Sequence, residues 1–144
     1  MTLLLDHDLD IARWTAVRLG VDTLNRLASA IGVLDEDGVV IGGCVLHNWS
    51  RYDMELSYYG PGTMTVGMLK IIAQNVVDAG CHRLTLRCSR RDSKRLVPGY
   101  LKLGFRYEGC QERLYGPTRE DDAMLYGLVA DRAERFLRRM KKAA

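Results

Sequence analysis

The sequence predicts an α/β protein, of the α+β kind, in which a mixed and mostly antiparallel sheet carries helices on both faces. Two β-branched runs flank residues 35–38, which is the pattern of a β-hairpin with Asp37-Gly38 in its turn. Residues 53–88 follow the order strand, glycine-rich loop, helix, strand, and this order predicts a right-handed parallel crossover. The remaining strands follow one another closely enough to pair antiparallel, so the predicted sheet is mixed.

The first half of the chain is predicted to begin with helices. Apolar residues at helical spacing follow Asp8 and Asp10, either of which can cap a helix that ends near Gly20. A short second helix is expected over residues 22–27. The hairpin over residues 29–47 and a third strand, Asp53 to Tyr59, complete this half.

The second half alternates helices and strands. A helix from about Val66 stops at Gly80, and a buried strand follows from Arg83 to Cys88. Asp92 or Ser93 is expected to cap a further helix through about Leu103, with Pro98 making it irregular. The last elements are expected to be strands over residues 106–115 and 123–129, followed by a basic helix.

One corner of the chain is especially well defined. Gly104 can adopt the left-handed conformation that closes a helix, and it follows Leu103 and precedes Phe105. Phe105 and Tyr107 then alternate with polar residues, which predicts a half-buried strand.

Length and composition predict one globular domain without a membrane anchor. The 144 residues are 47% hydrophobic, enough for one core, yet no apolar run is long enough to span a bilayer. The N-terminus lacks the basic segment of a secretory signal, so a cytoplasmic location is expected, in a host cell if the gene belongs to a phage. The four cysteines are scattered without a Cys-x-x-Cys pair, which indicates reduced thiols and disfavours a zinc site.

Positive charge is concentrated at the end of the chain. The net charge of +3 is too small to argue for nucleic acid by itself, and nucleic acid is not the expected partner. The tail is expected to be a solvated helix face with cations at its C-terminal end, and a phosphate-rich partner is the alternative. Its cations are Arg132, Arg135, Arg138, Arg139, Lys141 and Lys142. We expect residues 1–130 to form the main domain and residues 131–144 a basic helix or tail of it.

The glycine-rich segment after residue 59 is a candidate anion site. A glycine turn before a helix presents backbone N–H groups at the positive end of the helix dipole. Gly60, Gly62, Thr63 and Thr65 occupy this place, although a tight turn with a threonine cap has the same pattern. Gly60 and Gly62 do not make a dinucleotide fingerprint, because the third glycine and the downstream acid are not in register.

A tyrosine one helical turn before a Leu-Gly-Phe corner, together with the element order, resembles the GNAT superfamily of N-acetyltransferases over nearly the whole chain. Stretches at residues 10–14, 41–49, 55–57 and 103–109 also resemble a smaller group of phage and prophage GNAT-like proteins. The resemblance implies acetyl-coenzyme A as co-substrate, no metal, and a central β-α-β unit that binds the cofactor.

The resemblance also implies which residues bind the cofactor. They are Ser57, Tyr58, Gly60, Gly62, Thr63, Thr65, Gly67, Ser93 and Tyr100. The loop departs from the family pattern because it carries neither Arg nor Gln. Arg91, Lys94 and Arg95 are candidates to supply the missing positive charge, and Ser93 is equally a candidate helix cap.

Three residues are implied as catalytic. Tyr100 would protonate the thiolate leaving group, and Glu55 would take the proton of the attacking amine. His47 is the second candidate base, because its ordinary pKa suits the task. A backbone N–H near residues 56–58 would polarise the carbonyl. Each also has a structural reading: a core tyrosine, a solvent-facing carboxylate and a histidine at a strand end.

The function implied is therefore acetyl transfer from acetyl-coenzyme A to a primary amine by direct attack. The alternative is a GNAT-shaped phage protein without turnover that serves a structural or host-binding role, since one fold hosts many functions. The aromatic residues Trp49, Tyr52, Tyr58 and Tyr59 either line an acceptor pocket or pack the sheet. The acceptor is not specified by the sequence, and a homodimer is possible.

Overall fold

The computed structural model describes residues 2–61 and 64–144, which form seven strands, four α-helices and one 3₁₀ helix. The chain divides into two compact units, residues 1–61 and 62–144. The basic terminal helix belongs to the second unit. Gly62 and Thr63, two of the predicted cofactor residues, lie outside the described residues.

The first unit is a four-stranded antiparallel arrangement with one helix. Its elements are β1 (Thr2–Leu4), α1 (Asp8–Leu19), β2 (Ser29–Leu34), β3 (Val40–His47) and β4 (Asp53–Tyr59). The strands pair in the order β1-β2-β3-β4. The predicted hairpin is confirmed: the Asp35 carboxylate accepts the N–H groups of Asp37 and Val39, both at 2.9 Å. This carboxylate fixes the turn that brings β2 against β3.

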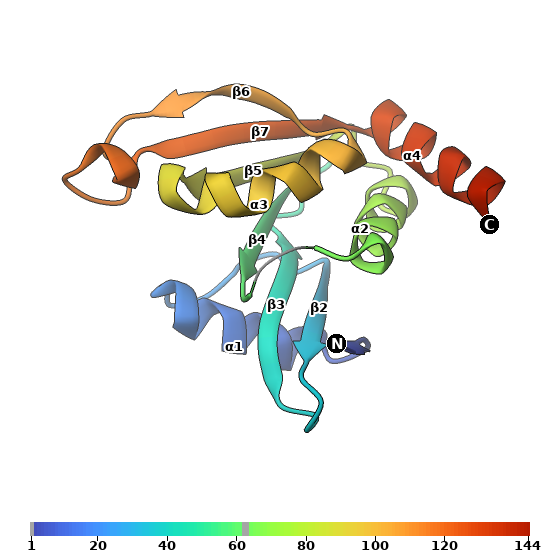
Figure 1. The fold of residues 1–144 in the computed structure, drawn as a ribbon, viewed down its shortest axis with the longest axis horizontal. Coiled ribbons are helices and arrows are strands. Elements are labelled where there is room, and N and C mark those ends of the chain that lie inside the picture. Colours follow the sequence, from blue (N-terminus) through green and yellow to red (C-terminus); the bar gives the residue numbers. More distant parts are fainter. Residues whose placement is uncertain (1, 62–63) are drawn as a thin grey trace. The chain divides into compact units, whose positions relative to one another are not determined.

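Helix α1 covers one face of these strands (Figure 1). Ile11 and Ala12 of the helix are buried with Ala30 of β2 and Val45 of β3. Gly43 lets the helix approach closely, because a Cβ there would collide with the Thr15 hydroxyl. The Thr15 hydroxyl in turn donates to the Ile11 carbonyl at 2.7 Å, so this polar group is satisfied inside the core.

Two expectations for the first unit were wrong. Residues 22–27 form no helix, because the carbonyls of Asn25 and Arg26 accept the N–H groups of Asn48 and Trp49 at 2.8 and 3.2 Å. Asp8 does not cap α1 either: its carboxylate accepts the N–H of Ala30, 22 residues away, and so ties the helix start to β2. Strand β1 was not predicted.

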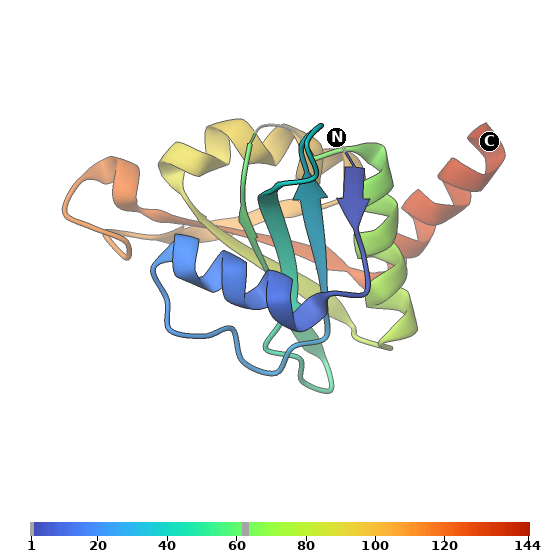
Figure 2. The ribbon, with the colours of Figure 1, turned by 90° about the horizontal axis from the view of Figure 1, so that it is seen from below.

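The second unit contains α2 (Val66–Asp78), β5 (Arg83–Ser89), α3 (Arg90–Leu103), β6 (Arg106–Gln111), the 3₁₀ helix η1 (Arg119–Asp121), β7 (Ala123–Val129) and α4 (Ala130–Ala143). The strands pair antiparallel in the order β5-β7-β6. Helix α3 packs on β5 and β7, and α2 lies beside α4 (Figure 2). The predicted order of strand, loop, helix and strand from β4 to β5 is confirmed.

The ends of α3 show what sequence predicts well and badly. Gly104 closes the helix at φ +119°, and its N–H donates to the carbonyls of Leu101 and Tyr100, as predicted. The start was predicted wrongly: Ser89 is the cap, and its hydroxyl accepts the Asp92 N–H at 3.1 Å. Asp92 and Ser93 lie inside the first turn, where an acidic side chain also favours the helix dipole.

Strand β6 is shorter than expected and ends at Gln111. Arg113 leaves the extended conformation at φ +57°, and its N–H donates to the Asp122 carboxylate at 2.9 Å. This contact draws the segment into a turn-rich loop rather than a strand.

The cysteines form no disulfide among the described residues: Cys44, Cys81 and Cys88 are buried and Cys110 is exposed. Burial raises the pKa of the Cys44 thiol to about 12. Burial, together with the charge of Asp92, raises the pKa of the Cys88 thiol to about 12. Within the described chain, no helix has both the length and the apolar character that crossing a bilayer requires.

Candidate functional site

Strands β3 and β4 bring three of the predicted site residues together on one face. His47 lies opposite Glu55 in the ladder, and its Nε2 lies 2.8 Å from the Ser57 hydroxyl. Glu55 and Ser57 share a face because side chains alternate along β4, whose other face buries Met54, Leu56 and Tyr58. His47 and Glu55, the two alternative candidate bases, therefore lie side by side, and Ser57 lies on the same face.

The environment of His47 favours a neutral imidazole. The side chain is only 4% exposed, and burial lowers the pKa of His47 below its ordinary 6.5, while the charge of Glu55 acts in the opposite direction. The buried Nδ1 has no hydrogen-bond partner among the described residues. A neutral imidazole beside a carboxylate is a proton acceptor at physiological pH, so this cluster has the chemistry of a general base.

The end of β4 is closed by contacts of its own. The Tyr58 hydroxyl donates to the Pro61 carbonyl at 2.7 Å, and the ring is buried. Gly60 adopts φ +149°, and a Cβ there would lie 2.7 Å from the Gly42 Cα. Gly60 therefore serves the close approach of this segment to β3, a structural need separate from any role in anion binding.

The aromatic residues near β4 divide into two groups. Tyr59 makes an edge contact with Trp14 of α1 at 6.0 Å between ring centroids, and Tyr58 is a core residue. Trp49 and Tyr52 are 47% and 52% exposed in the connector between β3 and β4. Trp49 and Tyr52 are therefore the better candidates for contact with an acceptor.

The start of α2 is chemically suited to an anionic group. Thr65 is its N-cap, and the Thr65 hydroxyl accepts the Met68 N–H at 3.2 Å. The first turn, which includes Gly67, carries no acidic residue, and the first N–H groups of a helix have no acceptor within the helix. The donor set of backbone N–H groups thus fits a phosphate, with Thr65 engaged in capping.

The other predicted cofactor residues lie on α3. The Ser93 hydroxyl is 2.8 Å from the Tyr126 hydroxyl of β7, so it already has a partner. Tyr100 is fully buried, and its ring contacts Phe105 edge-on at 5.3 Å between centroids. Tyr100 is thus firmly positioned by the corner that Gly104 closes.

The cations proposed to replace the missing loop charge each have a carboxylate nearby. Arg91 lies 3.3 Å from Asp121, Lys94 3.3 Å from Glu120, and Arg95 3.5 Å from Asp92. All three side chains are substantially exposed, so these pairs are weak and can be exchanged for a phosphate.

Comparisons with known proteins show which fold this chain shares. No protein-family model matches the sequence, and no curated protein matches it. Solved structures do match. Spermidine N-acetyltransferase SpeG of Vibrio cholerae, an F149A mutant, aligns at TM-score 0.62 and 13% identity over 97% of this chain and 99% of its own. The putative acetyltransferase yncA of Salmonella typhimurium, solved with acetyl-CoA, aligns at 0.63 and 16% over 90% and 94%. A putative phosphinothricin N-acetyltransferase aligns at 0.57 and 16% over 89% and 97%.

The chain has the GNAT fold. These matches confirm the predicted fold class, and they show that the likeness to GNAT structures extends over nearly the whole chain. At these identities the likeness concerns the GNAT fold alone, so the roles of individual residues rest on their own geometry.

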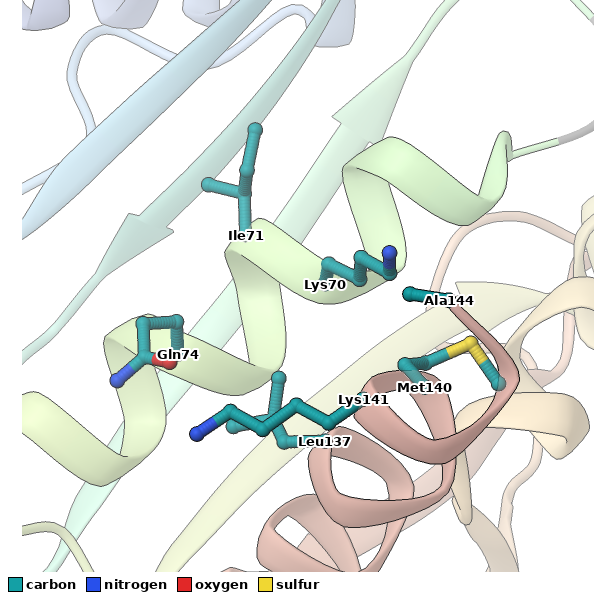
Figure 3. A pocket seen from close by; sticks show the side chains of 7 residues that line it. All are labelled: Lys70, Ile71, Gln74, Leu137, Met140, Lys141 and Ala144. Carbon is teal, nitrogen blue, oxygen red and sulfur yellow. The ribbon is translucent and has the colours of Figure 1, made fainter.

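A hollow elsewhere in the second unit is not lined by any predicted site residue. It has a volume of about 370 Å³ and lies between α2 and α4. Figure 3 shows that α2 contributes Lys70, Ile71 and Gln74 to its lining, whereas α4 contributes Leu137, Met140 and Lys141. Its lining is mainly apolar and contains no histidine or carboxylate side chain.

Two relationships were missed by sequence reasoning. The contact of Ser57 with His47 could be predicted only by knowing the register of β3 against β4. The alternation of side chains along β4 was enough to place Ser57 on the same face as Glu55. Asp122 was not singled out, yet it is 3% exposed and is shared by Arg90 and Arg113. An Asp-Asp pair immediately before an apolar strand was the only available signal.

Proposed function

We propose that this protein is an N-acetyltransferase of GNAT type, which moves an acetyl group from acetyl-coenzyme A to a primary amine. The observation that carries the proposal is the environment of His47. Burial favours its neutral form, Glu55 lies opposite it, and the Ser57 hydroxyl is hydrogen-bonded to it. A primary amine is mostly protonated at neutral pH, so a transferase for amines needs a group that accepts its proton.

The reaction proposed is a direct displacement. The amine nitrogen forms a bond to the thioester carbonyl carbon while the bond from that carbon to sulfur breaks. His47 takes the proton from nitrogen, and Glu55 either supports the resulting imidazolium or acts as the base itself. In the complex, where the buried phenol of Tyr100 must become uncovered, it gives its proton to the departing sulfur and regains one from solvent. A backbone N–H of residues 56–58 stabilises the negative charge on the carbonyl oxygen.

We propose that acetyl-coenzyme A is bound by the cofactor residues that the family resemblance implies. The start of α2, at Thr65 and Gly67, offers backbone N–H groups with no nearby acidic residue in the first turn, and Gly62 and Thr63 precede it. Ser93 is proposed to contact the cofactor arm, with its hydroxyl exchanging Tyr126 for the ligand. Ser57, Tyr58 and Gly60 are proposed to border the thioester, and Arg91, Lys94 and Arg95 to face the phosphates.

The acceptor is proposed to be a small amine. SpeG is a spermidine N-acetyltransferase by name, so spermidine is the first acceptor to test, followed by phosphinothricin and a lysine peptide. Acetyl-coenzyme A and reduced thiols both suit the cytoplasm, which is the compartment we propose. Light scattering of the purified protein tests whether it is a homodimer.

The deciding experiment has two steps. Thermal unfolding is first measured with acetyl-coenzyme A, which at a hundred times its Kd should add about 2.7 kcal/mol to native stability. Acetyl transfer is then measured across the amine panel for the starting protein, His47→Gln, and the control His82→Gln, an exposed histidine of the second unit. We expect His47→Gln alone to lose activity, by about 10²-fold or more.

An absence of stabilisation at millimolar acetyl-coenzyme A would contradict the proposal. It would favour a GNAT-shaped protein without turnover, such as a structural or host-binding component of a phage.

A further inference from the structure

The second unit carries a concentration of guanidinium groups at one end of its strands. Arg83 of β5 and Glu108 of β6 are joined by an ion pair, with Arg83 Nη1 donating to Glu108 Oε2 at 3.2 Å. Arg106 of β6 lies opposite Gly127 of β7, and Arg132 of α4 donates from Nη2 to the Gly127 carbonyl at 3.1 Å. A Cβ at Gly127 would collide with both Arg83 and Glu108, so the glycine allows these side chains to cross the strand.

The neighbouring arginines are close enough to act on Arg132. Burial lowers the pKa of Arg132, and the charges of Arg106, Arg83 and Arg135 lower it further, while Glu108 alone raises it. Three guanidinium groups thus act on Arg132 against one carboxylate, Glu108, which is itself paired with Arg83. Such a cluster is under-neutralised, and an added anion would relieve the repulsion.

Helix α4 extends this cluster along its exposed side. At 100° per residue, Arg135, Arg138, Arg139 and Lys142 fall within an arc of about 100°. All four side chains are exposed, and none has a carboxylate within ion-pair distance in the described part of the chain. Asp131 and Glu134 lie on the same helix but pair with none of the four. We name Arg106, Arg135, Arg138, Arg139 and Lys142 the basic surface.

The apolar side of α4 is already occupied by its own unit. Ala133 and Phe136 are at most 3% exposed, and α4 packs against α2. A helix that binds a lipid surface must insert an apolar face, and the apolar face of α4 is turned towards α2, with Leu137 and Met140 lining the hollow between the two helices. Arginine also matches phosphate oxygens with paired N–H groups, so the surface favours a phosphate backbone over a bilayer.

We propose that the basic surface binds the phosphate backbone of double-stranded nucleic acid without reading its sequence. The stripe from Arg135 to Lys142 is about 10 Å long at 1.5 Å per residue, and phosphates repeat about every 3.4 Å of helix axis along one strand. It therefore covers about three phosphate intervals, which is four successive phosphates for its four cations, and Arg106 of β6 offers a fifth contact. The proposal is independent of the proposed acetyl transfer.

The test is binding of a fluorescent 24-base-pair DNA duplex, measured by anisotropy from 50 to 200 mM salt. Five phosphate contacts predict a slope of about −4.5, which is about 500-fold weaker binding over this range. The variant Arg135→Gln/Arg138→Gln/Arg139→Gln should retain two contacts and weaken by only about 12-fold over the same range. Its affinity at 50 mM salt should also fall at least tenfold.

Two further variants separate charge from other effects. Arg135→Lys/Arg138→Lys/Arg139→Lys keeps the charge and should keep the salt slope. Arg13→Gln/Arg18→Gln/Arg51→Gln removes three exposed arginines of the first unit and should leave the slope unchanged. Thermal unfolding of each variant confirms that it is folded.

Equal weakening by the two glutamine variants would overturn the proposal, since net charge would then explain the binding. Loss of the slope in the lysine variant would also overturn it. A third contrary outcome is binding to phosphatidylglycerol vesicles that depends on the same arginines while the duplex does not bind.

Discussion

His47 Nε2 and the Ser57 hydroxyl lie 2.8 Å apart across β3 and β4, and this contact joins the one buried histidine of the described chain to a hydroxyl. The hydroxyl fixes the ring orientation, because Nε2 cannot turn away without leaving a buried polar atom unsatisfied. Among the described residues, Glu55, opposite His47, is the one charged group that raises the pKa of the imidazole. The protonation of His47 is therefore set by burial on one side and one carboxylate on the other.

Replacing Glu55 with Gln should lower the pKa of His47 further, since the carboxylate acts to raise it. Because the folded pKa lies below the unfolded 6.5, neutral His47 favours folding, and stability falls as pH drops from about 6.5 through the folded pKa. NMR titration of the His47 ring, and the acid limb of the pH–rate profile, should both move to lower pH in Glu55→Gln. Glu36→Gln, at the exposed hairpin tip, is the matched control. An unmoved His47 titration would show that the two groups are not coupled.

Tyr100→Phe should separate chemistry from structure. The ring fills a fully buried site against Phe105, so phenylalanine keeps the packing, and stability should change by only about 1 kcal/mol. Turnover should fall by about 10²-fold or more if the phenol protonates the leaving thiolate. Calorimetry should find acetyl-coenzyme A affinity nearly unchanged. Full activity in this variant would remove Tyr100 from the acid role.

Asp122 should make the second unit sensitive to acid. The Arg113 N–H bond, with help from the guanidinium groups of Arg90 and Arg113, lowers the pKa of Asp122 from 3.8 to about 2. The stabilisation is complete above about pH 4 and is lost as pH falls towards 2, because protonation then removes the acceptor charge. Asp122→Asn should be less stable at pH 7 and lose less stability between pH 4 and 2 in urea unfolding. Equal acid dependence in both proteins would contradict this.

Gly60→Ala should destabilise the first unit more than Gly20→Ala. Both glycines have a positive φ that L-residues rarely adopt, +149° at Gly60 and +73° at Gly20, and the left-handed conformation of Gly20 costs an L-residue about 1–2 kcal/mol. Only at Gly60 does a Cβ meet backbone, at 2.7 Å from the Gly42 Cα, whereas nothing lies within 4 Å at Gly20. Chemical unfolding of the two variants measures the difference. Equal losses would mean that the approach to β3 relaxes freely.

What the sequence could predict depended on the range of the interactions. The hairpin turn and the Gly104 helix stop are set by residues within four positions, and both were predicted correctly. The helix expected over residues 22–27 failed because its carbonyls bind N–H groups more than 20 residues away. The end of β6 was misplaced because the Arg113 N–H donates to the carboxylate of Asp122, nine residues further along the chain.

The site shows the same division. Alternation along β4 is by itself enough to place Glu55 and Ser57 on one face. The pairing of Ser57 with His47 depends on the register across a five-residue connector, which residue patterns do not fix.

Cys110 stands apart from the other three cysteines because it alone is exposed. A colorimetric thiol reagent used to follow the release of coenzyme A will therefore also titrate one sulfur per protein molecule, and each assay needs that blank subtracted. The same sulfur offers a single attachment point for a maleimide dye on the edge strand of β5-β7-β6. The buried cysteines, Cys44 and Cys88 among them, would stay unlabelled until the chain unfolds. The rate at which they are modified therefore measures how often the protein unfolds.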